Sequence, residues 1–463
     1  MKYNFFNFKR FGDRFLLTND FGKYLIVSVA EFRQIIAKTV VVNSDLGCRL
    51  LGSDMAYVGT DLEYSSSKRY ELRQSKGFEG VATSLHIFVV TTACNADCVY
   101  CQARDASHCD ALFMSREVAE KSVDVALQSP AHHLTFEFQG GEPLLNYDVI
   151  KHIVSYAERH KGKHEITYSI VTNLTMLNDE ILDFFADFNV GISTSLDGPE
   201  YLHDSNRPFK NGGGTFANAV DAIALIRKRG LRVGAIQTTT KASLRYPEEI
   251  VKTYARLGFD SIFVRPLTPL GKAQENWESV GYSAEEFVAF YKRIVDELIA
   301  SNKAGRFLRE EHAAILVSRI EGKFVNYMEL RSPCGAGVGQ LAYYPDGKVF
   351  TCDEGRMVYE MGDAAFCLGD VRNNVYSEMI GCGVCRAVCA SSILETVPSC
   401  CDCVYQPYCG TCPVVNYACE QDVFEKEPRS YRCRLYSGML DYLFDILSGD
   451  DAQAAAILRS WSN

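Results

Sequence analysis

The sequence predicts a mixed α/β protein: a partial (β/α)6 barrel between a small amino-terminal α+β module and a cysteine-rich carboxyl-terminal domain. Two observations predict this fold. From residue 81 onward, short apolar runs alternate with helical patterns, as in βα units on a parallel sheet. Beyond residue 333 the chain becomes loop-rich and holds most of its 18 cysteines, which indicates a domain organised by metal.

Length and composition limit the possible functions. The chain has 463 residues, enough for about two to three domains, and 47% of them are hydrophobic. It has no apolar run of the ~20 residues that a membrane span needs and no signal-peptide pattern, so we expect a cytoplasmic protein that has no membrane partner. The net charge of -10 argues against nucleic acid as a partner. In a reducing cytosol, so many cysteines indicate metal ligation rather than disulfides.

Residues 1–80 are predicted to form the amino-terminal module. The apolar runs Phe15–Thr18 and Tyr24–Val27 flank a turn-rich tetrapeptide and predict a β-hairpin, and Ser28–Ile36 has a helical pattern. The polar segment Tyr64–Arg69 predicts a linker. A peptide added as a strand to an exposed sheet edge would make this module a peptide-recognition element, and a module that only caps the barrel is the equal alternative.

Residues 81–300 are predicted to form the barrel. The predicted strands are Leu85–Val90, Leu134–Phe138, Ile166–Val171, Val190–Leu196, Val233–Thr238 and Ser261–Val264. The last helix begins with a capping box, Ser283 with Glu286. Because six βα units are too few to close an eight-stranded barrel, we expect a barrel that is open on one side.

Polar motifs follow five of the predicted strands. They are Thr91–Cys101, Gln139–Pro143, Thr172–Asn173, Asp197–Pro199 and Arg265–Pro266. In a parallel barrel all such loops open at the carboxyl face, where these folds place their active sites. We therefore expect one active site built from these loops.

The first of these loops carries Cys94, Cys98 and Cys101, spaced Cys-x3-Cys-x2-Cys. Three thiolates from one loop can hold three irons of a [4Fe–4S] cluster and leave the fourth iron open. A zinc site would normally use a fourth protein ligand and Cys-x2-Cys pairs, and three buried thiols are the remaining alternative.

Residues 301–333 are predicted to form a helical connector, residues 334–440 the cysteine-rich domain, and residues 441–463 a carboxyl-terminal helix. The turn Pro345-Asp346-Gly347 between two β-prone runs predicts a hairpin that brings Cys334 and Cys352 together.

The cysteine triplet, with Tyr100 before its last cysteine and Gly140-Gly141-Glu142-Pro143 after the second strand, resembles the radical S-adenosylmethionine (radical SAM) superfamily. Cys334-x12-Gly347-x4-Cys352, then Cys400-x2-Cys403-x5-Cys409-x2-Cys412 and Cys433, resemble its SPASM extension. Two motifs in this order are more specific than either alone. The resemblance implies a TIM-like partial barrel, S-adenosylmethionine (SAM), a catalytic [4Fe–4S] cluster and two auxiliary iron–sulfur clusters, also of the [4Fe–4S] type.

The resemblance also implies which residues bind these cofactors. Cys94, Cys98 and Cys101 would ligate the catalytic cluster, and the amine and carboxylate of SAM would bind its open iron. The SAM-binding residues would be Gly140, Gly141 and Glu142 at the amino group, Ser195 and Arg207 at the carboxylate and ribose, and Asn173 and Tyr100 at the ribose and adenine. Each also has a structural alternative, as a tight turn or a surface side chain.

In the SPASM pattern, one auxiliary cluster would be held by Cys400, Cys403, Cys409 and Cys433, and the other by Cys334, Cys352 and Cys412. The family has three residues before the last cysteine of its quartet, whereas this chain has two. The three-cysteine cluster would keep an iron open to substrate or to another residue, such as Cys401 or Cys419.

Asp353 directly follows Cys352 and matches the proposed base of sulfatase-maturing relatives. We therefore predict that Asp353 is the general base, and an ordinary capping or solvated carboxylate is the alternative.

Six further cysteines lie outside these predicted ligand sets. Cys382, Cys385 and Cys389 share one helical face, which favours a packed thiol stripe over a further cluster. Cys48, Cys109 and Cys367 are predicted to be ordinary small hydrophobic side chains.

The segments Phe8–Gly22 and Cys403–Val414 are similar to the first maturase of His-Xaa-Ser peptide systems. This resemblance implies an enzyme that cleaves SAM reductively to a 5′-deoxyadenosyl radical and oxidatively modifies a ribosomally made precursor peptide. It implies three partners: the precursor, a ferredoxin- or flavodoxin-type electron donor, and a second radical SAM maturase. An anaerobic sulfatase-type maturase that forms formylglycine is the alternative within this class, and a zinc-organised interaction scaffold is the alternative outside it.

Overall fold

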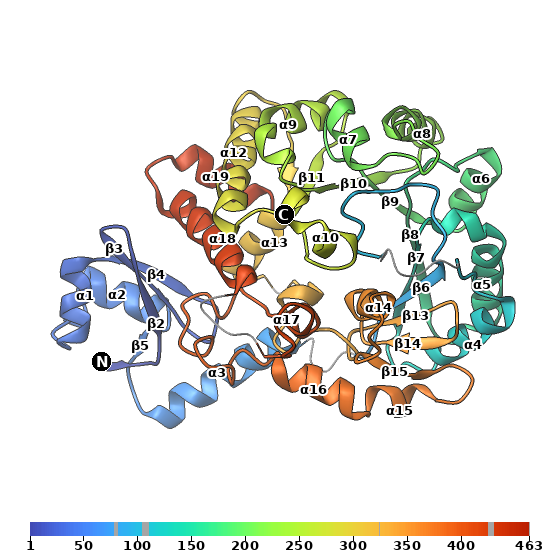
Figure 1. Ribbon diagram of the computed structural model, residues 1–463. Coiled ribbons are helices and arrows are strands. Elements are labelled where there is room, and N and C mark those ends of the chain that lie inside the picture. The colour runs from blue at the N-terminus through green and yellow to red at the C-terminus, as the bar shows by residue number, and fades with distance from the viewer. Residues whose placement is uncertain (78–81, 104–110, 324, 425–429, 463) are drawn as a thin grey trace.

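Six parallel strands, which follow one another in chain order, form the centre of the computed structural model (Figure 1). The structure describes residues 1–77, 82–103, 111–323, 325–424 and 430–462. The six strands are β6 (Leu85–Thr91), β7 (His133–Gly140), β8 (Glu165–Val171), β9 (Gly191–Ser195), β10 (Val233–Thr238) and β11 (Ser261–Arg265). All six predicted strands are confirmed, with small differences at their ends.

These strands belong to a ten-stranded sheet in the order β12-β11-β10-β9-β8-β7-β6-β13-β14-β15. Every pair from β6 to β11 is parallel. Alternate residues of β7 face opposite sides, so that Leu134, Phe136 and Phe138 are buried while Glu137 and Gln139 remain partly accessible. The α/β fold with a central parallel sheet is confirmed, and the closure of this sheet into a partial barrel stays a prediction.

Helices connect the strands and cover the apolar side of the sheet (Figure 1). They are α4 (Arg116–Ala126), α5 (Tyr147–His160), α6 (Asp179–Asp187), α7 (Glu200–Asn206), α8 (Phe216–Lys228), α9 (Pro247–Arg256), α10 (Lys272–Glu275), α11 (Trp277–Val280) and α12 (Ala284–Lys303). The predicted capping box is present at the start of α12, where Ser283 and Glu286 bond each other's backbone. The main core packs Phe136 and Phe138 of β7 against Ile150 and Ile153 of α5.

The amino-terminal module has its own small core. Its elements are β1 (Lys2–Tyr3), β2 (Asn7–Phe11), β3 (Arg14–Thr18), β4 (Tyr24–Ser28), α1 (Val29–Ile36), α2 (Asp45–Gly52), β5 (Ala56–Tyr57) and α3 (Asp61–Ser75). The predicted hairpin and helix are confirmed as β3, β4 and α1, and β2 adds a third antiparallel strand.

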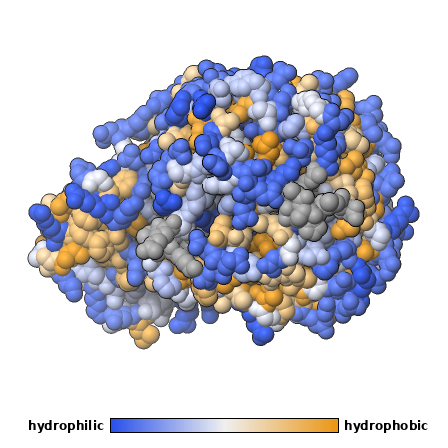
Figure 2. Space-filling view, viewed as in Figure 1, coloured by the Kyte–Doolittle hydropathy of each residue, from blue (hydrophilic) through white to orange (hydrophobic). Residues whose placement is uncertain are grey.

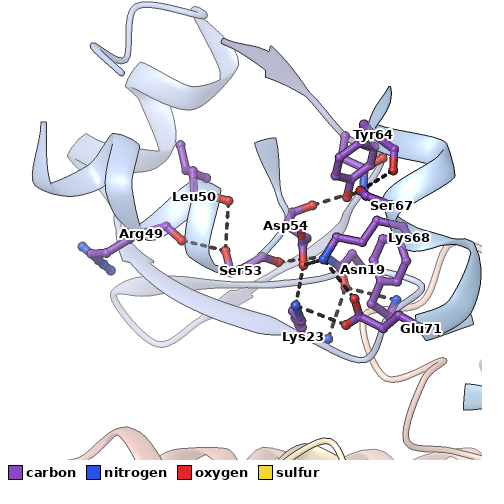
Figure 3. Close-up of polar contacts among 12 residues, drawn as sticks. Asn19, Lys23, Arg49, Leu50, Ser53, Asp54, Tyr64, Ser67, Lys68 and Glu71 are labelled. Atoms are coloured by element: carbon purple, nitrogen blue, oxygen red, sulfur yellow. Dashed lines mark hydrogen bonds and ion pairs between the residues drawn. The ribbon is translucent and has the colours of Figure 1, made fainter. Parts of the chain in front are cut away.

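The predicted linker Tyr64–Arg69 is wrong, because these residues lie inside α3. Thr60 and Glu63 form reciprocal bonds that start the helix, a capping box that the sequence contained. Ion pairs then hold this polar helix to the module, as Figure 3 shows: Lys68 Nζ lies 2.6 Å from Asp54 Oδ2, and Lys23 Nζ lies 3.2 Å from Glu71 Oε1. Lys23 also pairs with Asp54.

The rest of the chain extends the main sheet at both edges. The predicted connector contains β12 (Arg309–Glu310), which pairs with β11, and the amphipathic helix α13 (Glu311–Ile320). On the other edge, β13 (Gln340–Tyr343) pairs in parallel with β6, and β14 (Lys348–Phe350) and β15 (Cys367–Asp370) follow. The hairpin predicted around Asp346 is confirmed as β13 and β14.

The remaining helices are α14 (Asp353–Glu360), α15 (Tyr376–Ile380), α16 (Gly383–Ser391), α17 (Pro413–Glu420), α18 (Tyr431–Ser448) and α19 (Ala452–Ser460). Helix α18 crosses the predicted domain boundary at residue 440, so that boundary does not separate two elements. In the described ranges, no helix is both long enough and apolar enough to cross a membrane.

Of the three cysteines predicted as ordinary hydrophobic side chains, Cys48 is exposed and Cys367 is half-buried. The prediction is therefore wrong for Cys48, which lies on the outer side of α2. Cys109 lies outside the described residues.

Candidate active site at the carboxyl ends of the strands

Cys94, Cys98 and Cys101 lie in the loop that follows β6, and each thiol is within electrostatic range of another. Burial raises the pKa of Cys94 and of Cys98 to about 11. As free thiols these groups would stay protonated at neutral pH, and a bound metal cation would convert them to thiolates.

The spread of the thiols bears on which metal they fit. At a Zn–S distance of about 2.3 Å, tetrahedral thiolates lie roughly 3.8 Å apart. Among the described residues, the only three possible ligand atoms that lie within 4.8 Å of one another belong to His132, His133 and Glu165 on the surface. The cysteine sets are therefore too widely spaced for single zinc ions, and they fit a multi-iron cluster better.

Gly140 and Gly141 join the end of β7 to the cysteine loop. The amide of Gly141 donates to Thr91 O at 2.8 Å, and that of Glu142 donates to Ala93 O at 2.7 Å. A Cβ atom on Gly141 would lie 2.2 Å from Ala93 O. Only glycine permits this approach, so both glycines are needed to place the cysteines, whatever else they bind.

Glu142 is 1% exposed and serves as an internal acceptor. Its carboxylate accepts from Thr172 Oγ1 at 2.6 Å, from the Asn173 amide at 2.8 Å and from the Leu144 amide at 3.1 Å. Burial raises the pKa of Glu142 to about 7. The Glu142 carboxylate thus connects the loops after β7 and β8. The contact between Glu142 and the amino group of SAM stays a prediction.

Asn173 continues this connection to the cysteine loop. Its Nδ2 donates to Asn95 Oδ1 at 2.8 Å, and Asn95 in turn donates to Thr175 Oγ1 at 2.7 Å. Asn95 lies in the cysteine loop, between Cys94 and Cys98 in the chain. Ser195 is the last residue of β9 and lies at the same edge of the sheet. The loops that carry the predicted SAM-binding residues are therefore brought together at one edge.

Asp197 is a buried carboxylate that accepts several hydrogen bonds, and the sequence interpretation gave it no role. It accepts from Tyr100 OH at 2.6 Å, from Asn206 Nδ2 at 3.0 Å and from Arg207 Nε at 3.2 Å. Arg207 stacks over the Tyr100 ring at 5.1 Å and places a guanidinium nitrogen 3.9 Å from Cys98 Sγ. Tyr100 and Arg207, predicted as SAM contacts, are thus also fixed beside a predicted iron ligand.

Asp353 belongs to a chain of polar contacts that crosses the site. Its Oδ1 pairs with Arg356 Nε at 2.8 Å, and Arg356 donates to Gln139 Oε1 at 3.3 Å. Gln139 Nε2 then donates to Glu137 Oε1 at 2.6 Å. Arg356 is 2% exposed and pairs also with Glu360, and both groups lie within electrostatic range of Cys101. This chain connects the start of α14 with the inner face of β7.

The first carboxyl-terminal cysteine set, Cys334, Cys352 and Cys412, is buried in one apolar cluster. Cys352 and Cys412 are the N-cap residues of α14 and α17, so each thiol lies at the positive end of a helix. The Glu354 carboxyl lies within electrostatic range of all three thiols, and burial raises its pKa. The hairpin does bring Cys334 and Cys352 together.

The second set, Cys400, Cys403, Cys409 and Cys433, lines one cavity of about 60 Å³. The amino-terminal module packs against this segment, since Asn7 Nδ2 donates to Cys401 O at 3.3 Å and to Cys403 O at 3.1 Å. Cys419 is exposed, and Cys401 adjoins the second set, so neither belongs to the apolar cluster around Cys334.

Comparison with known proteins identifies the central domain. The model of the radical SAM superfamily matches residues 88–257, which include the cysteine loop and β7 to β10. An uncharacterized protein of Methanothermobacter thermautotrophicus is 30% identical over 44% of this chain and 75% of its own length. The chain belongs to the radical SAM superfamily. It spans 63% of the length of an uncharacterized protein of Methanocaldococcus jannaschii that is 31% identical.

Other radical SAM relatives extend beyond this domain. A cysteine-type anaerobic sulfatase-maturating enzyme of Clostridium novyi is 23% identical over 70% of this chain and 86% of that enzyme. The fold is similar to that of anSMEcpe with bound AdoMet, with a TM-score of 0.68, 21% identity, and 82% and 99% of the two chains covered. It is also similar to Streptococcus suis SuiB bound to S-adenosylmethionine, with a TM-score of 0.55, 14% identity, and 92% and 99% covered.

Membership of the radical SAM superfamily indicates an enzyme that uses SAM and a [4Fe–4S] cluster. The buried, widely spaced thiols beside Arg207 and the glycine-dependent packing of their loop fit such a cluster. Sequence interpretation missed Asp197, Arg356 and Glu137. Glu137 and Gln139, two polar residues at alternate positions of an otherwise apolar strand, were the available signal for a polar inner face.

Proposed function

We propose that this chain is a radical SAM peptide maturase that oxidatively modifies a ribosomally made precursor peptide, and that residues 334–440 form a SPASM domain with two auxiliary [4Fe–4S] clusters. The observation that carries this proposal is the position of Asp353. Its carboxylate lies next to Cys352 in the chain and is held by Arg356 to Gln139, at the end of β7 that leads into Gly140-Gly141-Glu142. A carboxylate at this place supports a reaction in which the substrate loses a proton between the two groups of cysteines.

The residues of the chain have distinct roles in this proposal. When bound, SAM and the catalytic cluster supply a 5′-deoxyadenosyl radical that removes a hydrogen atom from the substrate. Cys94, Cys98 and Cys101 hold that cluster, and the loops joined by Glu142 and Asp197 orient SAM. Asp353 takes the proton at its carboxylate, and Arg356 fixes the direction in which this carboxylate points.

The auxiliary cysteine sets would hold the iron–sulfur clusters, and those clusters would supply the acceptor for the electron that the substrate releases. Cys400, Cys403, Cys409 and Cys433 share a cavity, as ligands of one cluster must. Cys334, Cys352 and Cys412 share the second site, where burial raises the pKa of each thiol, so a bound cluster would be needed to hold them as thiolates. The x2 spacing before Cys412 does not prevent it from joining Cys334 and Cys352.

We further propose that the precursor carries His-Xaa-Ser repeats and that the amino-terminal module binds the leader part of this precursor. Figure 2 shows hydrophobic atoms gathered over this module, where Phe5 and Phe8 are 57% and 51% exposed. These rings lie beside or on the outer strand β2, to which a peptide strand could be added. A ferredoxin- or flavodoxin-type protein would supply the electron, and a second radical SAM maturase would act on the same precursor.

The alternative function is that of an anaerobic sulfatase-type maturase, which forms formylglycine. The similarity to the Clostridium novyi sulfatase-maturating enzyme over 70% of this chain favours it. Both functions use the same radical chemistry and the same Asp353, so only the substrate separates them.

The test uses anaerobically reconstituted protein with SAM and a strong reductant. A radical SAM enzyme should release 5′-deoxyadenosine and methionine. If neither product is released, the proposal is wrong. A synthetic peptide with His-Xaa-Ser repeats and a peptide from a sulfatase active site are then compared as substrates by mass spectrometry. A loss of mass in the first alone supports the precursor maturase, and a change in the second alone supports the alternative.

A further inference from the structure

Helix α16 carries three thiols that belong to none of the cluster sets. Cys382 is the N-cap residue, Cys385 lies in the first turn and Cys389 lies one turn further. Cys385 is 1% exposed, and its thiol hydrogen-bonds with that of Cys389 and lies within electrostatic range of Cys382. The predicted thiol stripe therefore exists as a contact group in which Cys385 is the shared neighbour.

The three thiols lie beside the cysteine set around Cys334. Val384 and Val388 of the same helix pack against Cys334, Cys352 and Cys412. In the loop after Cys334, Gly337 approaches so closely that a Cβ atom there would lie 2.6 Å from Cys385 Sγ. A chemical change at the Cys385 thiol would therefore alter the packing of the loop that begins at Cys334.

A small molecule can reach this group from the surface. Cys389 lines a cavity of about 490 Å³ together with Lys76, Arg331 and Ser332. The hydrogen bond from Cys385 and the nearby Arg331 guanidinium lower the pKa of Cys389 below its usual value. The cavity also contains Glu395, which pairs with Lys76 at 2.6 Å, so Arg331 is the basic group through which an anionic thiol compound would be attracted to Cys389.

The arrangement fits thiol–disulfide chemistry better than metal binding. Cys382-Gly383-Val384-Cys385 is a Cys-x2-Cys pair at the start of a helix, and its two thiols lie within electrostatic range of each other. Cys382 makes no side-chain capping bond that would occupy its sulfur. Within the described part of the chain, these three thiols do not lie within 4.8 Å of one another, as the ligands of a single ion would.

We propose that Cys382, Cys385 and Cys389 form a thiol–disulfide exchange site that takes a small anionic disulfide of the glutathione type. A thiolate of Cys382 or Cys389 attacks the disulfide, forms a mixed disulfide and releases one thiol. Cys385 then displaces the second thiol and forms a disulfide with the attacking cysteine. The protein loses two electrons and two protons, and the small disulfide gains both as two thiols.

The test measures thiols and not SAM chemistry, so its outcome is independent of the proposed function. The reconstituted holoenzyme is incubated anaerobically with glutathione disulfide, quenched in acid, alkylated and mapped by mass spectrometry. We expect one internal disulfide that contains Cys385, is reversed by dithiothreitol and leaves the iron content unchanged.

Two variants and a control define the result. Cys385→Ser should abolish the internal disulfide. Because Cys385 is buried and its replacement could disturb folding, the double variant Cys382→Ser with Cys389→Ser provides a second test. It removes both proposed disulfide partners of Cys385 and should also abolish the internal disulfide. Cys48→Ser, at an exposed thiol, should behave as the wild type. Glutathione adducts at Cys48 and Cys419 alone, an internal disulfide in the Cys385→Ser chain, or a metal ion held by the three thiols would each overturn the proposal.

Discussion

Arg207 and Asp197 form a buried ion pair beside the cysteine loop. Nε of Arg207 lies 3.2 Å from Oδ1 of Asp197, and the two side chains are 13% and 0% exposed. The same guanidinium reaches Cys98 Sγ, and the same carboxylate accepts the Tyr100 hydroxyl. Through this ion pair, the position of the loop after β9 affects the position of Cys98, a predicted iron ligand.

Replacing Asp197 by Asn should destabilise the fold and the cysteine loop together. Losing one partner of a buried ion pair costs about 3–5 kcal/mol, because the other charge stays desolvated. We expect a lower melting temperature and less iron bound per chain after reconstitution. Asp221→Asn, at an exposed position of α8, should change stability by no more than about 0.5 kcal/mol. Normal iron binding in the Asp197→Asn protein would contradict the coupling.

Replacing Gly141 by Ala should reduce iron binding and leave the rest of the fold intact. The added Cβ would lie 2.2 Å from Ala93 O, so the cysteine loop would have to shift. The measurement is iron and sulfide content, compared with far-ultraviolet circular dichroism of the same sample. Gly234→Ala in β10 is the matched control, because its Cβ would meet no atom within 4 Å. If both variants bind iron alike, the close contact does not place the cysteines.

Glu142 and Glu310 should each lower the stability of the unloaded protein as the pH rises from 4.5 to about 7. Burial raises the folded-state pKa of both carboxyls from 4.5 to about 7, so over this range the folded state binds more protons there than the unfolded state, and each residue lowers stability by about 3 kcal/mol. Burial lowers the pKa of His86 and His312 to about 3 and that of His203 to about 4, which raises stability with pH over the same range. The contribution of each glutamate is therefore measured as a difference between the wild type and its variant in the pH dependence of the melting temperature.

Two glutamine variants separate the fold from the site. Between pH 4.5 and about 7, Glu142→Gln and Glu310→Gln should each shift the slope of melting temperature against pH toward more positive values than in the wild type, whatever their absolute stability. Only Glu142→Gln should weaken SAM binding, measured by calorimetry on the reconstituted protein, since Glu310 lies away from the cysteine loop and accepts from Val264 and Tyr291. An unchanged pH slope in both variants would refute the raised pKa values.

Asp353→Asn should slow peptide oxidation by about 100-fold or more, the usual effect of losing a general base, and should leave SAM cleavage intact. Arg356→Lys should have a smaller effect in the same direction, because an ammonium group cannot reproduce the contacts of the guanidinium with Asp353, Glu360 and Gln139. Product formation and 5′-deoxyadenosine are measured in one assay. Arg372→Lys, on the surface, is the control. Unchanged oxidation by Asp353→Asn would make this residue an ordinary carboxylate.

Local patterns were enough to predict the elements of the central sheet. The six strands follow from apolar runs such as Leu85–Val90, and α12 follows from its capping box. The same signal at Thr60 and Glu63 was present for α3, but the helix has no apolar face, and its stability comes from ion pairs with Asp54. Short strands such as β12 form only because β11 is already in place.

The cysteine sets could be predicted from spacing, whereas the residues that hold them could not. Arg356 and Gln139 are 217 residues apart in the chain, and Asp197 and Tyr100 are 97 apart. No local pattern records such a pairing, because it depends on how the sheet and α14 pack. The role of Gly141 likewise depends on the path of a loop from the neighbouring strand.

The parallel pairing of β13 with β6 has a consequence for electron transfer. It places the strand that leads to the first cysteine loop and the hairpin between Cys334 and Cys352 in one continuous ladder, from Gln340 beside Leu85 to Tyr343 beside Phe88. In the proposed enzyme, the tunnelling distance between clusters held by these two cysteine sets would therefore be set by backbone hydrogen bonds and not by the docking of separate bodies. Electron exchange between them should accordingly proceed at the same rate in viscous solvents that slow domain motion.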